Sequence, residues 1–205
     1  MKVSVIIPYN QDRGYLDLCI DSIKAQTYPD VEIIPSFSPG TCGYNFNRGL
    51  EKATGEFIKL IAEDDWLPPT SLADSVNGIG GAPWICANAW NMGKTTIELD
   101  KSVGLSFKET LDANGIHGGS TLFRTEILRE IGGMDEALEV GEEWDMYLRL
   151  MSRGYMPGYI DKEVYYYRRW NHGKSWIDNN YRHKWRQTQL NLIRARYDFD
   201  SDSQL

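Results

Sequence analysis

The sequence FIKLIAEDDW at residues 57–66 places a short apolar run directly before three adjacent acidic residues. Such a run is typical of a strand that is buried on both faces of a sheet. Similar runs occur at residues 3–8 and 31–34, and segments with helical spacing at residues 16–26 and 44–53 separate the three runs. This alternation of strands and helices predicts an α/β fold with right-handed crossovers and a parallel, doubly wound sheet.

The second half of the chain has a less regular pattern. Strands are expected at residues 84–89, 120–123 and 164–167, and helices at residues 125–131, 142–151 and 179–197. The sequence contains no repeat and no low-complexity tract, and its 205 residues suit one domain. We therefore expect a single domain over residues 1–197, followed by a tail or the start of a linker at residues 198–205.

Charge is unevenly distributed along the chain. The 22 basic and 29 acidic residues give a net charge of −7 at pH 7. Residues 163–197 nevertheless hold eight basic and two acidic residues, so this stretch carries +6 and the remainder −13. The acidic body argues against a nucleic-acid-binding protein. The basic helix expected at residues 179–197 is either a packing helix or a docking surface for an acceptor, a partner or a membrane.

Cysteine content and hydropathy indicate a soluble protein in a reducing compartment. Cys19, Cys42 and Cys86 are odd in number and form no C-x-x-C pair, which favours free thiols. The first apolar run is too short for a signal peptide, and no run approaches the ~18 apolar residues of a membrane span. These features predict a cytoplasmic protein, in the host cytoplasm if the chain is virally encoded.

Acidic residues form the first candidate site, at Glu63, Asp64 and Asp65. Adjacent carboxylates repel one another, and a hard cation such as Mg²⁺ or Mn²⁺ gives a physical reason to keep them together. Residues 8–10, Pro-Tyr-Asn, follow the first strand at the same edge, where open α/β sheets bind ligands. The alternative for the acidic residues is a solvated turn that caps the next helix.

Two further clusters combine groups that could carry chemistry. Residues 141–145, GEEWD, begin a predicted helix, where acidic side chains either complement the helix dipole or supply a general base. Residues 167–175, YRRWNHGKS, combine a histidine with cations that suit a phosphate group, or form a surface loop after an edge strand. Neither cluster decides the function alone.

Five stretches follow one another in a defined order along the chain. They are VSVIIPYNQDRGYLDLCIDSIKAQTYPDVEII at residues 3–34, NRGLEKATGEFIKLIAEDDWLPP at residues 47–69, GGSTLFRTEILREIGGMDE at residues 118–136, GEEWDMYLRLMSRG at residues 141–154 and YYRRWNHGKS at residues 166–175. In this order they resemble the inverting family 2 glycosyltransferases. The resemblance implies a GT-A fold, which is Rossmann-like with a mostly parallel central sheet between helices. It also implies a nucleotide-binding half at residues 1–75, an acceptor half at residues 76–177 and a C-terminal helix at residues 178–197.

By this resemblance the chain moves a sugar from a nucleoside diphosphate sugar, with a UDP-sugar favoured, to a hydroxyl group with inversion. The implied acceptor is a glycan, a glycoprotein or a glycolipid. Asp64, Asp65 and His172 are implied to bind Mn²⁺ or Mg²⁺. Glu143 matches the family's base, and Glu142 matches the acid before it. The residues implied to bind the donor are Pro8, Tyr9, Asn10, Phe37, Asn47, Glu63, Asp65 and Arg168.

Two departures from the family pattern leave alternatives open. Ala62 stands where the metal-binding D-x-D motif has its first aspartate, and residues 35–40 lack the carboxylate that usually holds the nucleobase. Phe37 either stacks on a base or belongs to the core. One alternative is therefore a non-catalytic domain that binds a nucleotide sugar or a glycan within a larger protein. The other is a sugar nucleotidyltransferase. That class has a Gly-rich basic loop after the first strand, and residues 9–14 match such a loop poorly.

Overall fold

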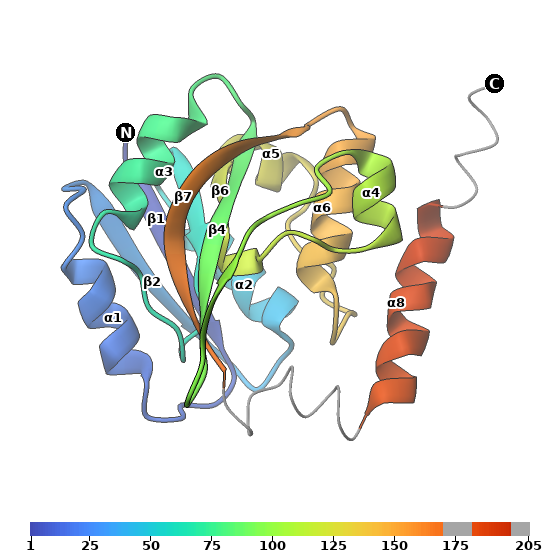
Figure 1. Cartoon of the computed structure of the whole chain (residues 1–205), viewed down its shortest axis with the longest axis horizontal. Helices are drawn as coiled ribbons and strands as arrows, with labels where there is room; N and C mark the ends of the chain where they lie inside the picture. Colours follow the sequence, from blue (N-terminus) through green and yellow to red (C-terminus); the bar gives the residue numbers. More distant parts are fainter. Residues whose placement is uncertain (170–181, 198–205) are drawn as a thin grey trace.

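The computed structural model describes residues 1–169 and 182–197, which form a central sheet flanked by helices (Figure 1). The strands are β1 (Val3–Tyr9), β2 (Val31–Phe37), β3 (Phe57–Leu60), β4 (Trp84–Met92), β5 (Ile97–Asp100), β6 (Leu122–Arg124) and β7 (Pro157–Arg168). The helices are α1 (Leu16–Lys24), α2 (Cys42–Lys52), α3 (Ser71–Ile79), α4 (Phe107–Asp112), α5 (Thr125–Glu130), α6 (Glu142–Ser152) and α8 (His183–Tyr197), and a 3-10 turn, η1 (Gly118–Ser120), precedes β6.

The order of the strands brings three carboxyl ends to one edge of the sheet. β1 lies between β2 and β3 and is parallel to both. β6 is antiparallel to β3 and to the start of β4, β5 is antiparallel to the end of β4, and β7 is parallel to β4. The predicted α/β class is thus confirmed. The sheet is mostly parallel, as the family resemblance implies, and β5 and β6 are its antiparallel strands.

Apolar layers cover both faces of the sheet. Ile6 of β1 belongs to a cluster with α2, α5 and α6, whereas Val5 and Ile7 belong to a cluster with α1 and α3. Figure 1 shows these two groups of helices on opposite sides of the sheet. Successive side chains of a strand point to opposite faces, so a continuous apolar run is the pattern that such a doubly covered strand requires.

The observed elements differ from the predicted ones mainly in length. The strand predicted at residues 164–167 is the end of the longer β7, whose residues 161–163 are exposed and polar and carry no apolar signal. β5 exposes three of its four residues, so its sequence also lacked a strand pattern. α8 begins at His183, and residues 179–181 of the predicted helix lie outside the described part of the chain.

The basic helix α8 uses several of its charges to attach itself to the acidic body. Its apolar residues form a cluster with α4 and α6. Arg194 donates to the main-chain carbonyl of Asp112 at the end of α4 (2.9 Å), and Arg196 forms an ion pair with Asp145 of α6 (2.9 Å). These contacts support the packing alternative for this helix. Docking of a partner or a membrane through its other residues stays a prediction.

The cysteines and the helices can be compared with the expectation of free thiols and with the expectation that no segment spans a membrane. All three cysteines are free thiols, as their number and spacing predict. Burial raises the pKa of Cys86 to about 11, so this thiol stays protonated near neutral pH. Among residues 1–169 and 182–197, no helix has both the length and the hydropathy needed to cross a bilayer.

Lys59 is a charged residue in the middle of the apolar core. It belongs to β3, its side chain is fully buried, and its Nζ lies 6.0 Å from the ring centroid of Tyr165. Within the described residues, Nζ has no hydrogen-bond partner. Burial therefore lowers the pKa of Lys59 from its usual 10.5 to about 7.

Replacement of Lys59 by methionine is expected to stabilise the fold. An unpaired buried polar group costs roughly 1–3 kcal/mol, and Met fills a similar volume without this cost. Since the folded pKa is lower than the unfolded one, the unfolded chain binds the extra proton between pH 7 and 10.5. The advantage of Lys59→Met should be largest below pH 7 and should shrink as the pH rises towards 10.5.

Denaturant unfolding of both proteins from pH 6 to 10 measures this difference. Lys162→Met changes an exposed lysine of β7 and serves as the matched control, with no pH-dependent gain. A Lys59→Met protein that is less stable than the wild type at pH 6 would show that the ammonium group is stabilised in the fold.

Candidate functional site

The carboxyl ends of β1, β2 and β3 lie at the same edge of the sheet as the end of β7 (Figure 1). β7 is held there by an isolated antiparallel bridge between Trp66 and Tyr166, with N–H···O distances of 3.0 and 3.3 Å. The rings of these two residues are 5.4 Å apart. The bridge brings Arg168, the last residue of β7, to the acidic segment that follows β3.

The three acidic residues differ in how deeply they are buried. Glu63 is buried and forms an ion pair with Arg13. Asp65 is also buried, and its carboxylate accepts hydrogen bonds from the hydroxyl of Tyr165 (2.6 Å) and the main-chain N–H of Arg168 (2.7 Å). Asp64 lies between them and is half-buried. Asp64 is thus the most exposed of the three carboxylates, and its role as a cation ligand stays a prediction.

Burial and neighbouring charge raise the pKa of Glu63 and of Asp65. Burial and the charge of Asp64 raise the pKa of Glu63, and the nearby Arg13 opposes this shift. Burial and Asp64 also raise the pKa of Asp65 well above its usual range, against the hydrogen bonds from Tyr165 and Arg168. A cation bound at this edge would relieve the repulsion, because it favours the ionised form of each carboxylate.

Arg168 supplies a positive charge at the same place. Its Nε donates to the main-chain carbonyl of Asp64 (2.7 Å). The guanidinium carbon lies 4.1 Å from the ring centroid of Tyr15 and 4.8 Å from that of Trp66, within the range of cation–π contacts. These three contacts fix the guanidinium group next to the acidic segment, where it is suited to bind a phosphate group.

The ends of β1 and β2 form the neighbouring part of the edge. Pro8 is buried in β1, Asn10 is exposed, and the rings of Tyr9 and Phe37 lie 5.1 Å apart. Phe37 is 60% exposed, which rules out the core alternative and leaves its ring accessible for stacking. Asn45 of α2 fixes the two strand ends by donating to the carbonyls of Tyr9 and Ser38, at 3.0 Å each.

The second pair of acidic residues lies at the start of α6. Gly141 precedes the helix with φ +75°, a left-handed conformation that glycine adopts without strain. Glu142 is buried, and Glu143 is half-buried. Glu143 approaches η1 so closely that a Cβ placed on Gly118 would lie 3.1 Å from its Oε1. The carboxylate of Glu143 thus faces the turn that leads into β6.

Comparison with known proteins finds relatives that are named glycosyltransferases. No family model matches the chain. It is 26% identical over 200 residues to an uncharacterized glycosyltransferase of Rickettsia typhi, across 79% of this chain and 62% of that protein. An uncharacterized glycosyltransferase of Rickettsia felis is 24% identical over 202 residues, across 79% of this chain and 33% of that protein. The chain thus spans less than two-thirds of the length of the first relative and one-third of the length of the second.

Solved structures resemble the chain in fold. S. aureus TarS 1–349 in complex with UDP-GlcNAc has a TM-score of 0.66 at 17% identity, covering 84% of this chain and 60% of that chain. Mannosyltransferase PcManGT from Pyrobaculum calidifontis, in complex with GDP-Man and Mn²⁺, has a TM-score of 0.63 at 16% identity, covering 95% and 64%. This chain has the GT-A glycosyltransferase fold. The GT-A type predicted from the five stretches is confirmed.

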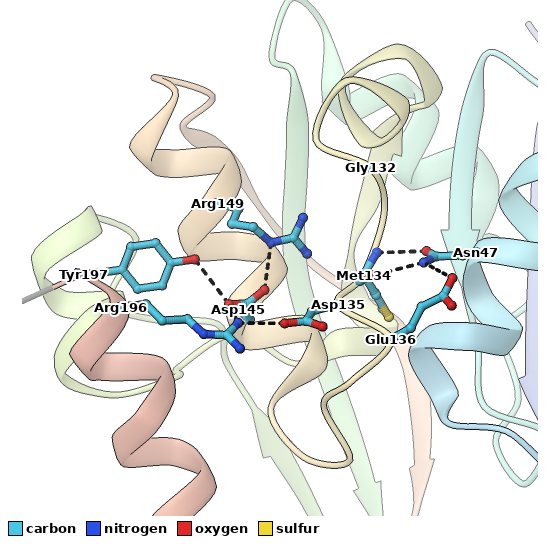
Figure 2. A pocket seen from close by; sticks show the side chains of 9 residues that line it. All are labelled: Asn47, Gly132, Met134, Asp135, Glu136, Asp145, Arg149, Arg196 and Tyr197. Carbon is cyan, nitrogen blue, oxygen red and sulfur yellow. Dashed lines mark hydrogen bonds and ion pairs between the residues drawn. The ribbon is translucent and has the colours of Figure 1, made fainter.

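Asn47, a predicted donor-binding residue, holds two parts of the GT-A fold together. Its Nδ2 donates to the carbonyl of Met134 and to Glu136, both at 2.9 Å, and its Oδ1 accepts from the N–H of Met134 (Figure 2). These bonds use the whole amide group to join α2 to the loop before α6. We therefore leave Asn47 out of the donor site proposed below.

A separate hollow of about 460 Å³ lies beside α6. It is lined by Asn47, Gly132, Met134, Asp135, Glu136, Asp145, Arg149, Arg196 and Tyr197 (Figure 2). Asp145 follows Glu143 by two residues and thus points about 200° around the helix from it. Its buried carboxylate accepts from Arg149 (2.7 Å) and Arg196 (2.9 Å). This network fastens α6 to α8 on the side away from Glu143.

A cation fits the acidic edge only with help from a bound donor. Among the described residues, no three histidine, cysteine, aspartate or glutamate side chains are grouped as a metal site. Mg²⁺ is often held by one or two carboxylates together with substrate phosphates, an arrangement that Asp64 suits. His172, the other predicted ligand, lies outside the described residues.

Sequence reasoning missed four residues that organise the site, namely Arg13, Tyr15, Asn45 and Tyr165. Arg13 and Tyr15 lie in the loop after β1, where the sequence shows no pattern that pairs them with residues fifty or more positions away. Asn45 could have been noticed as a polar residue on the buried face of the helix predicted at residues 44–53. Tyr165 sits in an aromatic run that predicted only a strand.

Proposed function

We propose that the chain transfers a sugar from a nucleoside diphosphate sugar to a hydroxyl group of a glycan, glycoprotein or glycolipid, with inversion at the anomeric carbon. One observation carries the proposal. The Nε of Arg168 donates to the main-chain carbonyl of Asp64 at the carboxyl edge of a GT-A sheet, and Glu143 lies in the first turn of α6. Two oppositely charged groups at a strand edge suit a cation and a diphosphate, and Glu143 suits the role of a base.

The residues of the edge divide the work of binding the donor. Tyr9, Asn10 and Phe37 would hold the nucleoside, with Pro8 shaping the strand end beneath it. Arg168 would bind the diphosphate, and Arg13 would keep Glu63 from repelling it. We favour a UDP-sugar as the donor, in keeping with the UDP-GlcNAc complex of TarS, although PcManGT was crystallised with GDP-Man.

Glu143 would act on the acceptor. As general base it removes the proton of the acceptor hydroxyl while the oxygen attacks the anomeric carbon. The attack comes from the face opposite the diphosphate, so the bond to the phosphate oxygen breaks and the configuration inverts. Arg168 offsets the charge that develops on the departing diphosphate. Glu142 is buried beside Glu143 and is the second candidate for the base.

A divalent cation, Mn²⁺ or Mg²⁺, belongs to the proposal as the partner of the diphosphate. Asp64 would hold it, together with His172 from the segment outside the described residues. Asp65 is left out because Tyr165 and Arg168 already occupy its carboxylate. When bound, the cation would act as a Lewis acid that stabilises the leaving diphosphate. The Mn²⁺ in PcManGT supports this assignment.

Release of nucleotide tests the proposed function. The protein is incubated with UDP-, GDP-, TDP- and CMP-sugars, Mn²⁺ or Mg²⁺ and a panel of glycan acceptors, and the freed nucleotide is measured. We expect release from one donor class, dependent on an acceptor, and an inverted anomeric configuration in the product by NMR. Release from no donor with any acceptor would contradict the proposal.

A non-catalytic binding domain remains the second candidate function. Ala62 replaces the first aspartate of the metal motif, and the chain spans only part of its relatives' lengths. Calorimetric binding of a nucleotide sugar without turnover on any acceptor would favour this alternative. We do not retain the nucleotidyltransferase alternative, because the Rickettsia relatives are named glycosyltransferases. The cytoplasmic placement and the single domain over residues 1–197 stay predictions.

A further inference from the structure

We propose that Tyr165 is a positioning residue that joins the donor side of the site to the acceptor side, through its hydroxyl on one and its ring on the other. The inference rests on the proposed function. Tyr165 lies in β7, opposite Ala89 of β4, and its side chain is fully buried. It does not line the donor edge itself, so its role is to hold the residues that do.

The hydroxyl of Tyr165 fixes the segment that carries the acidic residues. It donates to Oδ2 of Asp65 (2.6 Å) and accepts from the main-chain N–H of Ala62 (3.3 Å). These two residues lie on either side of Glu63 and Asp64. One hydroxyl therefore spans the turn that presents Asp64. Without it, Asp65 keeps, among the described residues, the bond from the N–H of Arg168, and the N–H of Ala62 loses the Tyr165 hydroxyl as its acceptor.

The ring of Tyr165 fixes the turn η1 on the acceptor side. A Cβ placed on Gly119 would lie 1.9 Å from Cζ of this ring, so the turn rests directly on the aromatic face and only glycine fits there. Gly118, the residue before Gly119 in the turn, lies beside Glu143, since a Cβ placed on it would be 3.1 Å from Oε1 of that glutamate. His117 also packs on the ring, with centroids 5.2 Å apart. A ring of this size therefore sets the distance between the turn and the sheet.

The contact of the Tyr165 hydroxyl and the contact of the Tyr165 ring lead to different predictions. A loss of the hydroxyl should loosen the acidic segment and leave η1 in place. A loss of the ring should loosen both, and the resulting shift of Glu143 should slow the chemical step. Small displacements of catalytic groups lower rates by about 10²-fold, whereas a lost hydrogen bond to a charged group weakens binding by about tenfold.

Two variants of Tyr165 test this separation by steady-state kinetics and amide hydrogen exchange. For Tyr165→Phe we expect a donor KM raised about tenfold with kcat near the wild-type value, and faster exchange at residues 62–65 but not at 118–120. For Tyr165→Leu we expect the same rise in KM, a kcat lowered about 10²-fold, and faster exchange at both segments. Tyr155→Phe is the matched control, since the hydroxyl of Tyr155 donates to Glu130 at the surface, away from both segments, and its loss should change neither segment.

The outcomes separate this inference from the proposed function. Exchange that changes as expected in a protein without any turnover would keep the positioning role and overturn the proposed function. Turnover with wild-type exchange at residues 62–65 in Tyr165→Phe would overturn the positioning role and keep the function. If Tyr165→Leu does not fold, Gly119→Ala probes the ring contact, and an unchanged kcat in that variant would also overturn the inference.

Discussion

Replacement of Glu143 by glutamine is expected to lower kcat by about 10²–10⁴-fold, the usual contribution of a general base. The amide has nearly the same shape as the carboxylate but cannot accept the acceptor's proton. Donor binding should be unchanged, because Glu143 faces η1 at the start of α6 and the donor edge lies at the ends of β1 and β3. Nucleotide release with acceptor gives kcat, and calorimetry with the donor gives its Kd.

Two further variants are compared with Glu143→Gln. Glu126→Gln changes an exposed glutamate of α5 and should leave both quantities unchanged. Glu142→Gln removes the neighbouring acid, which is buried and should affect stability more than chemistry. Full activity in Glu143→Gln together with loss of activity in Glu142→Gln would assign the base to Glu142.

Asp64→Asn is expected to lower kcat/KM by about 10²-fold, comparable to the loss of one group that stabilises charge in a transition state. The substitution keeps the shape of the turn but removes the carboxylate that we assign to the cation. The loss should be partly recovered at higher Mn²⁺ concentrations, because the phosphates and the remaining ligands still bind the ion. The measurement is the rate of nucleotide release as a function of Mn²⁺.

Asp65→Asn separates the two adjacent acids. Asp65 accepts from Tyr165 and from the N–H of Arg168, so its replacement should lower the melting temperature without changing the Mn²⁺ dependence. A rate that is unaffected by EDTA and by Asp64→Asn would contradict the metal role and leave Arg168 as the positive charge at the diphosphate.

The strands and helices that alternate in the first half of the chain could be predicted, because residues close together in the sequence mark each of them. The buried strands around Ile6 and Ile58 are mainly apolar runs, each interrupted by one polar residue (Ser4 and Lys59), and proline, glycine or acidic residues end them. β5 and the first part of β7 could not be predicted, since their exposed side chains carry no period. The apolar run at residues 57–61 predicted a strand that ends just before the acidic residues, and β3 confirms it.

The burial of Asp65 could not be predicted. The family register favours Asp64 as the cation ligand, but nothing in the sequence shows that the fold buries Asp65 against Tyr165, a residue one hundred positions away. Similarly, Asn47 looked like a donor ligand because it opens a family motif, and its partners in residues 134–136 become visible only in three dimensions. One basic residue of α8, Arg196, is explained in the same way, by its ion pair with Asp145, fifty-one positions away.

Titration of UDP and GDP into the protein with Mn²⁺, followed by calorimetry, tests most directly that this strand edge is a nucleotide-sugar site. We predict saturable binding of one nucleotide, weakened when EDTA removes the cation and weakened again by Asp64→Asn. Absence of heat for every nucleotide with either Mn²⁺ or Mg²⁺, in a protein shown to be folded, would contradict it.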